Sequence, residues 1–369
     1  MVGDVTHLPP LPAIPPDLRT LADYERRAQA HLTPEVWRHI QEGSGAEITL
    51  AENRTAFARI GLLPRALADL DGSTEIELLG RRHAAPLLLA PLAYQRLAHC
   101  DGELASVRAA TALGTGFIAS TLSSVSLEEI AVAAQSLGTP PPLWFQLYLQ
   151  PDREHSLQLV RRAESAGYEA IVLTVDAALK PAGIALPPGV EAVNLAGMPR
   201  PRQTAVPGGR ILLGTPLAAA APGWHDLAWL RKTTTLPILV KGLLLGEDAA
   251  RAVDEGADAL IVSNHGGRVL DGLPSPVELI QSVAEATSAR VPLLLDGGIR
   301  TGTDVVKALA LGASAVLLGR PVMHALAVAG MAGVAHAIHL LRTELEAAMA
   351  QLGCPRCDLL TAERLVRLG

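Results

Sequence analysis

Ser263-Asn264-His265-Gly266-Gly267-Arg268 is the stretch that decides the fold, because it begins at the end of the apolar run 259–263. Asp296-Gly297-Gly298-Ile299-Arg300 closes a second apolar run, and Gly319-Arg320 closes a third. Each run is typical of a buried parallel strand. Charged residues and glycines at the ends of successive parallel strands form the active sites of (β/α)8 barrels. The three segments therefore predict one site at the mouth of such a barrel.

Eight apolar runs alternate with amphipathic segments from residue 84 onward. The predicted strands are 85–90, 116–120, 143–148, 170–175, 237–241, 259–263, 292–295 and 315–318. The predicted helices include 102–113, 154–166, 247–255 and 303–311, and a last helix over 330–349. This alternation predicts an α/β fold, a closed (β/α)8 TIM barrel. An open doubly wound sheet is the alternative, and the lack of a GxGxxG turn after the first strand weakens it.

Two regions lie outside this alternation. Residues 1–83 are interpreted as an N-terminal helical extension, in which 18–70 caps one end of the barrel domain 84–369. Residues 177–222 form a long loop after the fourth strand, rich in proline, glycine and alanine. Long loops inside compact domains are usually lids or binding loops.

Composition excludes several classes of function. The net charge is −6 and the basic residues are scattered, which argues against a nucleic-acid partner. No uninterrupted apolar stretch reaches about 18 residues, and residues 1–16 lack a secretory signature, so neither a membrane span nor export is expected. Three cysteines suit a reducing cytoplasm. Cys354 and Cys357 form a CxxC without a second ligand pair, so we expect a helix-ending turn and no metal site.

His265 and Arg268 are the first candidates for chemistry. An imidazole at a barrel mouth suits proton transfer near neutral pH, and the two following glycines allow close approach of a ligand. The alternative is a histidine satisfied by the loop backbone. Arg268 can bind a carboxylate with its guanidinium fork. Its alternative is a surface salt bridge with Asp271.

Lys241 and Asp176 end two other strands. A lysine at the end of a buried strand is costly unless it faces an anion, which a substrate or a reduced cofactor would supply. The alternative is a buried ion pair with Asp176 or Asp296. Asp176 could orient His265 and stabilise its protonated form, or cap the segment that follows.

The remaining candidates line the same predicted mouth. Tyr148 and Gln146 end the third strand and could hydrogen-bond a ring cofactor and a substrate, although a tyrosine at the rim is also common. The ends of the seventh and eighth strands are where barrels bind phosphate, and rim salt bridges are the alternative for the two arginines. The residues there are Asp296, Gly298, Arg300, Gly319 and Arg320.

The segment 263–272, Ser-Asn-His-Gly-Gly-Arg-Val-Leu-Asp-Gly, resembles the signature of the FMN-dependent 2-hydroxy acid oxidases and dehydrogenases, of the glycolate, lactate and mandelate type. Trp144-Phe145-Gln146-Leu147-Tyr148 and Asp296-Gly297-Gly298-Ile299-Arg300 extend the likeness, which runs from about Leu21 to the C-terminus. The segments 90–97 and 120–126 look most like the hydroxymandelate oxidase branch.

This resemblance implies bound FMN and a role for each candidate. His265 would be the base, Asp176 its partner, Arg268 the carboxylate clamp and Tyr148 a donor to the substrate. Lys241 would stabilise the reduced flavin, assisted by Ser263. Further cofactor contacts would come from Pro91, Leu92, Ala93, Ser120, Gln146 and Thr174 at the ring, and from Asp296, Gly298, Arg300, Gly319 and Arg320 at the ribityl and phosphate. Relatives are often tetramers or larger, so a homo-oligomer acting on a small molecule is expected.

Two positions depart from the family pattern. His39 stands where relatives carry a tyrosine that helps to hold the substrate carboxylate. The Gly-Arg-Arg run that normally follows the fourth strand is absent, and with it a second substrate arginine. Lys180, Arg200, Arg202 and Arg210 are the candidates to replace it from the long loop.

Three functions stay open at this point. The first is oxidation of a 2-hydroxy acid to a 2-oxo acid, with an apolar or aromatic side chain favoured because Leu122 replaces an aromatic residue of many relatives. The second is a flavoenzyme for another substrate, without a free carboxylate or bound to a carrier. The third is a flavin-binding protein with little turnover.

Overall fold

Eight parallel strands form a closed barrel in the order β4-β5-β6-β7-β8-β9-β10-β11, so the open sheet is excluded. The computed structural model describes residues 6–177, 184–198, 212–215, 218 and 221–368. The barrel strands are β4 (Leu87–Leu89), β5 (Gly116–Ser120), β6 (Leu143–Leu147), β7 (Ala170–Thr174), β8 (Ile238–Leu243), β9 (Ala259–Ser263), β10 (Leu293–Asp296) and β11 (Ala315–Leu318). All eight predicted strands are present, and their bounds differ from the predictions by at most a few residues.

The interior of the barrel is filled by side chains from alternate positions of the strands. Leu88, Ile118, Trp144, Val172, Leu239, Ile261, Leu294 and Leu317 belong to one buried cluster. Side chains on a strand alternate between its two faces, so the residue two positions later points into the same interior. The next interior layer, toward the carboxyl end, therefore contains the residues that end the strands.

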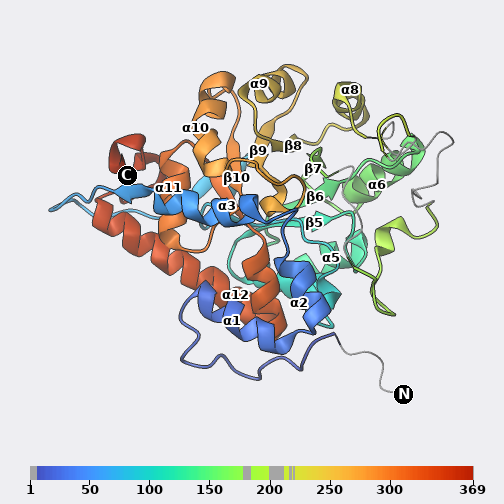
Figure 1. The fold of residues 1–369 in the computed structure, drawn as a ribbon, viewed down its shortest axis with the longest axis horizontal. Coiled ribbons are helices and arrows are strands. Elements are labelled where there is room, and N and C mark those ends of the chain that lie inside the picture. Colours follow the sequence, from blue (N-terminus) through green and yellow to red (C-terminus); the bar gives the residue numbers. More distant parts are fainter. Residues whose placement is uncertain (1–5, 178–183, 199–211, 216–217, 219–220, 369) are drawn as a thin grey trace.

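Helices surround the barrel, as Figure 1 shows. They are α4 (Glu103–Ala112), α5 (Leu127–Ala134), α6 (Arg153–Ser165), α8 (Trp224–Thr233), α9 (Gly246–Asp254), α10 (Pro276–Thr287), α11 (Gly302–Ala310) and α12 (Arg320–Leu352). Short 3-10 turns are η1 (Gln95–Leu97), η2 (Val193–Leu195), η3 (His265–Gly267), η4 (Cys357–Leu359) and η5 (Ala362–Arg364). The predicted helices at 102–113, 154–166, 247–255 and 303–311 correspond to α4, α6, α9 and α11.

The last helix is longer than predicted. α12 begins directly after β11 and is interrupted at Ala329 and Gly330, where Gly330 has φ 55°. The predicted helix 330–349 corresponds to the part after this interruption. By length and composition α12 could cross a membrane, yet 78% of its most apolar window is buried in the protein. Its apolar surface is explained by packing against α1 (Leu21–His31), α4 and α11.

The N-terminal extension covers the carboxyl end of the barrel. It contains α1 (Leu21–His31), α2 (Pro34–Gln41) and α3 (Ile48–Ala58), and α3 packs against η3 and α10. Figure 1 shows α3 across the front of the barrel, with α1 and α2 beside α12. α3 thus lies at the end of the barrel where the strands finish.

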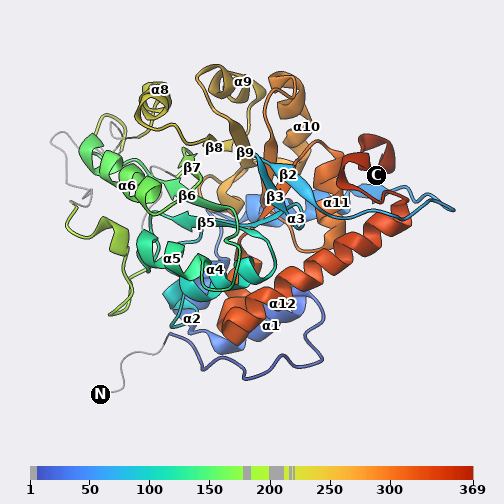
Figure 2. The same ribbon diagram turned by 180° about the vertical axis from the view of Figure 1, so that it is seen from behind.

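A hairpin closes the opposite end and was not predicted. It is formed by β2 (Ile76–Leu78) and β3 (Arg81–His83) and is visible in Figure 2. Leu78 belongs to the interior cluster, and the His83 ring meets the edge of Trp144 with 6.3 Å between centroids. A second small sheet pairs β1 (Ile60–Leu62) with β12 (Leu365–Arg367) and joins the extension to the C-terminus.

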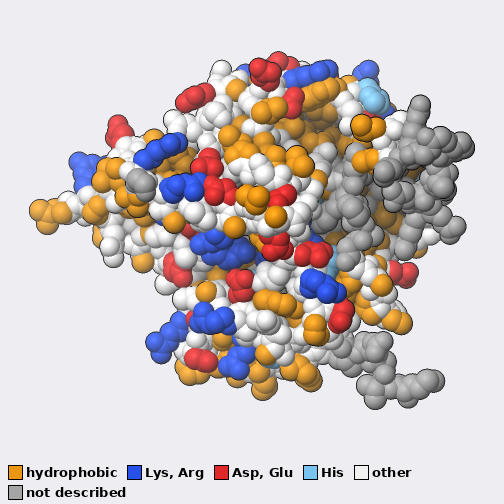
Figure 3. Space-filling view, in the orientation of Figure 1, with side chains coloured by type: hydrophobic (Ala, Val, Ile, Leu, Met, Phe, Trp, Pro, Cys, Tyr) orange, Lys and Arg blue, Asp and Glu red, His pale blue; other side chains and the backbone are white. Residues whose placement is uncertain are grey.

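The face in Figure 3 carries interspersed acidic and basic side chains, without a continuous basic surface. The CxxC lies just after α12. Both cysteines are free: Cys354 is buried, and the Cys357 thiol lies 3.5 Å from the carbonyl oxygen of Thr74. Among the described residues, neither belongs to a cluster that could hold a metal ion.

Candidate active site

Six neighbouring strands each contribute one polar side chain to the interior layer at the carboxyl end. Each of these residues follows an interior apolar residue by two positions, and none is more than 9% exposed. They are Ser120, Gln146, Thr174, Lys241, Ser263 and Asp296. A buried layer of this polarity is costly unless its groups find partners.

Lys241, Ser263 and Asp296 satisfy one another. The Lys241 Nζ lies 2.8 Å from both the Ser263 Oγ and the Asp296 Oδ2, and the Ser263 hydroxyl donates to the same carboxylate at 2.7 Å. Burial alone would lower the pKa of Lys241, but the carboxylates of Asp296 and Asp176 raise it above its ordinary value. Burial likewise opposes ionisation of Asp296, yet Lys241 and Ser263 hold its pKa below the usual range. The alternative ion pair with Asp296 is therefore present.

Gln146 and Thr174 keep polar atoms without partners. The Gln146 Oε1 accepts from the Ser120 hydroxyl at 3.1 Å and from the Thr121 N–H at 3.3 Å. The Gln146 Nε2 and the Thr174 Oγ1 are buried and make no hydrogen bond to any residue that the structure describes. Buried polar atoms are usually paired, so these two are suited to a bound polar group.

His265 lies in a tight turn whose residues adopt left-handed backbone angles. His265, Gly266 and Gly267 all have positive φ, with φ 56° at the histidine. The His265 N–H donates to the Ser263 Oγ at 3.0 Å, and its Nδ1 lies 2.8 Å from the Asp176 Oδ1. Left-handed non-glycine residues occur mainly where the surroundings enforce them, and active sites are a common case.

Asp176 follows β7 and faces both His265 and Lys241. Burial would raise its pKa, but Lys241 and then His265 hold the pKa below the ordinary value. A side chain at Gly242, on the adjacent strand, would approach Asp176 to within 2.6 Å. Glycine at that position therefore makes room for the carboxylate beside the histidine.

Arg268 is turned toward the N-terminal extension. Its Nη1 donates to the carbonyl oxygens of Ile40 and Glu42 at 3.0 and 3.2 Å, at the C-terminal end of α2. Burial lowers its pKa. The alternative salt bridge with Asp271 was wrong, because Asp271 accepts from the N–H groups of Ala46 and Thr49 at the start of α3.

Tyr148 lies near this arginine, and His39 precedes Ile40 on α2. Burial and the charge of Asp176 raise the pKa of Tyr148, while Arg268 acts in the opposite direction. His39 lies on α2, with its Nδ1 3.8 Å from the Glu42 Oε1. The structure thus brings His265, Asp176, Tyr148 and Arg268 to one side of the buried layer.

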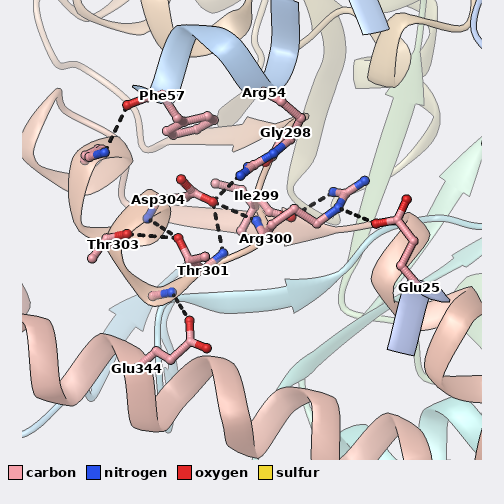
Figure 4. Close-up of polar contacts among 12 residues, drawn as sticks. Glu25, Arg54, Phe57, Gly298, Ile299, Arg300, Thr301, Thr303, Asp304 and Glu344 are labelled. Atoms are coloured by element: carbon pink, nitrogen blue, oxygen red, sulfur yellow. Dashed lines mark hydrogen bonds and ion pairs between the residues drawn. The ribbon is translucent and has the colours of Figure 1, made fainter. Parts of the chain in front are cut away.

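Arg320 and Arg300 lie at the ends of β11 and β10. Arg320 is the first residue of α12 and donates to the carbonyl oxygens of Ile40, Gly266 and Glu42 at 3.0–3.2 Å. Burial, with the charges of Arg268 and Arg300, lowers the pKa of Arg320 to about 9. Arg300 donates to its neighbouring carbonyl and extends toward Glu25, as Figure 4 shows.

Both arginines line a cavity of about 1100 Å³. Its other walls come from α1, α2 and α3, with Glu344 of α12. Gly319 caps the start of α12, and within the described part of the chain only Leu92 lies within 4 Å of the position of an added Cβ. Leu92, with Pro91 and Ala93, follows β4 and is partly exposed. Cationic side chains, glycine backbone and a helix start meet here, which suits an anion.

Sequence reasoning missed the residues by which α3 fixes this end. Arg54 of α3 bonds the Gly298 carbonyl and the Asp304 carboxylate (Figure 4). Asn53 exchanges two hydrogen bonds with Asn264. Nothing in the local pattern of 48–58 distinguishes these side chains, because their partners lie more than 200 residues away in the chain. Lys180, Arg200, Arg202 and Arg210, the suggested substitutes for the absent arginine, lie outside the described residues.

Gly298→Ala is expected to destabilise the protein by about 2–5 kcal/mol, since it adds left-handed strain and overpacking. Gly298 has φ 81°, and an added Cβ would lie 2.0 Å from the carbonyl oxygen of Asn53. Gly80→Ala is the matched control, because Gly80 has φ 74° with nothing within 4 Å, and we expect about 1 kcal/mol there. Denaturant unfolding measures both. Equal losses of stability in the two variants would show that close packing of α3 against Gly298 is not the cause.

Comparison with known proteins agrees with this geometry. A family model described as FMN-dependent dehydrogenase matches residues 28–367. An L-lactate oxidase of Alicycliphilus denitrificans is 49% identical over 96% of this chain and 98% of its own length. A 4-hydroxymandelate oxidase of Amycolatopsis orientalis is 48% identical over 91% of this chain and 94% of its own.

A crystal structure of mandelate oxidase with (S)-2-phenylpropionate superposes with a TM-score of 0.84 at 45% identity, covering 95% of this chain and 98% of that one. The barrel, the N-terminal helices and the sequence therefore agree over nearly the whole length. The chain belongs to the FMN-dependent dehydrogenase family and is an FMN-dependent oxidoreductase of the 2-hydroxy acid oxidase type.

Proposed function

We propose that the buried polar layer holds the flavin ring of FMN, and that the cavity at Arg300 and Arg320 takes its phosphate. The support comes from atoms that lack partners: the Gln146 Nε2 and the Thr174 Oγ1 are buried, and both face the interior where a ring edge would offer acceptors and donors. Lys241 lies in the same layer and would face the electron-rich edge of the ring.

The other proposed contacts surround this layer. Pro91, Leu92 and Ala93 would lie against the ring, with Ser120 and Ser263 at its polar edge. Asp296, Gly298 and Gly319 would hold the ribityl chain and the phosphate together with the two arginines.

The protein's own residues would then do the following. FMN, when bound, accepts the two electrons that leave the substrate. His265 takes a proton from the substrate at its Nε2, since its Nδ1 is engaged with Asp176. Asp176 holds the ring and stabilises the imidazolium that forms. Arg268 binds the substrate carboxylate, and Tyr148, which burial keeps protonated, donates a hydrogen bond.

We propose that the substrate is a 2-hydroxy acid with an apolar or aromatic side chain. Leu122, where many relatives carry an aromatic residue, would leave room beside Tyr94 and Tyr148. The Leu122 carbonyl accepts from the Tyr94 N–H at 3.0 Å, so the loops after β4 and β5 together form this side of the pocket. The 4-hydroxymandelate oxidase and the mandelate oxidase structure support an aromatic substrate, and the L-lactate oxidase supports a small one.

A second candidate is a substrate without a free carboxylate. The absent Gly-Arg-Arg run after β7 favours it, because Arg268 would then be the remaining family arginine for that group. An ester, an amide or a carrier-bound hydroxy acid would fit this reading.

Anaerobic mixing of the purified holoenzyme with candidate substrates tests the proposal. Bleaching of the flavin absorbance by mandelate-like acids faster than by lactate supports the first candidate. Bleaching by mandelamide or a mandelate ester alone supports the second. A bound flavin that no 2-hydroxy acid and no derivative bleaches would contradict both and leave a flavin-binding protein with little turnover.

Arg268→Met is expected to lower kcat/KM for mandelate about 10- to 150-fold, since a charge-assisted hydrogen bond contributes about 1.5–3 kcal/mol. For mandelamide, which carries no charge, the loss should be several-fold smaller. Steady-state kinetics with both compounds measure the difference. An equal loss for the two would remove Arg268 from carboxylate binding.

The cytoplasmic location and a homo-oligomer of four or more subunits stay predictions. So does the division into an extension, 1–83, and a barrel domain, 84–369. Gel filtration with light scattering tests the oligomer.

A further inference from the structure

Asn53 and Asn264 form a reciprocal pair of amides between the N-terminal extension and the turn that carries His265. The Asn53 Nδ2 donates to the Asn264 Oδ1 at 2.9 Å, and the Asn264 Nδ2 donates to the Asn53 Oδ1 at 2.8 Å. Each residue is 2% exposed. Such a pair is satisfied only when both amides are in register, so it fixes α3 and the turn relative to each other.

The pair is connected directly to the unusual backbone at His265. The Asn264 Oδ1 also accepts from the Gly267 N–H at 3.2 Å, which closes the turn around His265 and Gly266. The Asn264 Nδ2 donates further to the Pro274 carbonyl at 3.1 Å. Asn264 therefore holds the turn at both sides, and Asn53 determines how the Asn264 amide is oriented.

Asn53 also touches the turn on the phosphate side. Its carbonyl oxygen lies so close to Gly298 that a Cβ there would be 2.0 Å away, and its Nδ2 lies 3.7 Å from a Cβ placed at Gly297. One residue of α3 thus contacts the turns after β9 and β10, which would carry the base and part of the phosphate cradle. We propose that Asn53 is a positioning residue for His265, acting through Asn264; this inference rests on the proposed role of His265 as base.

The reason is geometric. A proton acceptor displaced by about 1 Å loses about 100-fold in rate even when substrate binding is intact. Without Asn53, the Asn264 amide would lose two of its four hydrogen bonds, and the strained His265 turn would be held less firmly. The rate of the reduction step should fall, whereas substrate affinity and the flavin environment should change little.

Three holoenzymes test this: wild type, Asn53→Leu and Thr49→Val. Thr49 lies one helical turn before Asn53 on α3 and docks the same helix, with its Oγ1 accepting from the Leu273 N–H at 2.8 Å. Thr49→Val thus weakens the docking of α3 and leaves the His265 turn intact. Asn53→Asp, which keeps the acceptor for the Asn264 Nδ2 but replaces the donor by a charged oxygen, serves as a second variant if Asn53→Leu does not fold.

The measurements are the limiting rate of flavin reduction at saturating mandelate, the substrate dissociation constant, the flavin spectrum and the midpoint of unfolding. We expect Asn53→Leu to reduce its flavin about 10- to 100-fold more slowly, with the dissociation constant within about twofold of wild type and the spectrum unchanged. Thr49→Val should lose comparable stability and keep the wild-type rate.

Two results overturn the inference alone: a wild-type rate in Asn53→Leu or Asn53→Asp, or rates that fall equally in Thr49→Val. A wild-type enzyme that no 2-hydroxy acid reduces overturns the proposed function, and this inference with it.

Discussion

His265→Ala is expected to lower the rate of flavin reduction by a 2-hydroxy acid about 10²- to 10⁴-fold while the protein keeps its yellow FMN. The Lys241–Ser263–Asp296 cluster should survive the substitution, because alanine keeps the backbone N–H that donates to the Ser263 Oγ. The loss should therefore fall on proton transfer and leave cofactor binding intact. Stopped-flow absorbance after anaerobic mixing measures it.

His225→Ala is the control, because His225 is 76% exposed on α8. It should reduce its flavin at the wild-type rate. Full activity in His265→Ala would remove His265 from the mechanism. Loss of FMN together with activity would assign His265 to cofactor binding.

Lys241→Met is expected to destabilise the protein by about 3–5 kcal/mol at neutral pH, because it leaves the buried Asp296 carboxylate without its cation. The Lys241 and Asp296 side chains are 5% and 12% exposed and 2.8 Å apart. FMN binding should weaken as well, since the layer then presents a negative charge to the ring edge. Denaturant unfolding and release of FMN on dilution measure the two effects.

The stability difference between wild type and Lys241→Met should depend on pH in a defined direction. In the wild type the pKa of Asp296 is lowered, so its contribution to stability is present above its unfolded pKa of about 3.9 and is lost as pH falls through the folded value. In Lys241→Met the buried carboxylate has a raised pKa, and its penalty disappears when it is protonated. The difference in stability between the two proteins should therefore shrink as pH is lowered toward about 4.

Lys241→Met combined with Asp296→Asn is the control. Removing both charges should recover most of the lost stability at neutral pH, because residue 296 then carries no uncompensated charge and Asp176 keeps its contact with His265. FMN binding should stay weak. If the double variant were as unstable as Lys241→Met, the ion pair would not be the cause of the loss.

Periodicity was sufficient to predict the barrel. All eight strands lie within a few residues of their predictions because parallel strands buried on both faces are continuous apolar runs, and this signal is local. Candidate polar residues at the strand ends could be predicted for the same reason. Ser120, Gln146 and Lys241 each stand two positions after an interior apolar residue, which places them on the same face.

The contacts between distant segments could not be predicted in this way. The hairpin 76–83 was missed because two strands of three residues carry too little pattern to be recognised. The hydrogen-bond partners of Arg268 could not be predicted either. They are the backbone carbonyls of Ile40 and Glu42, at the end of a helix about 230 residues earlier. Every residue has a backbone carbonyl, so residue type does not indicate which carbonyl the arginine will bind.

By itself the sequence determined a barrel with a histidine, a lysine and two arginines at the ends of its strands, because local apolar runs show which strands are buried and where they end. Only the tertiary structure decided how these groups pair: Lys241 with Asp296, His265 with Asp176, and Asn264 with Asn53. Pairing depends on strand register and on how the N-terminal helices dock over the mouth. These are properties of the closed barrel as a whole, which no single segment contains.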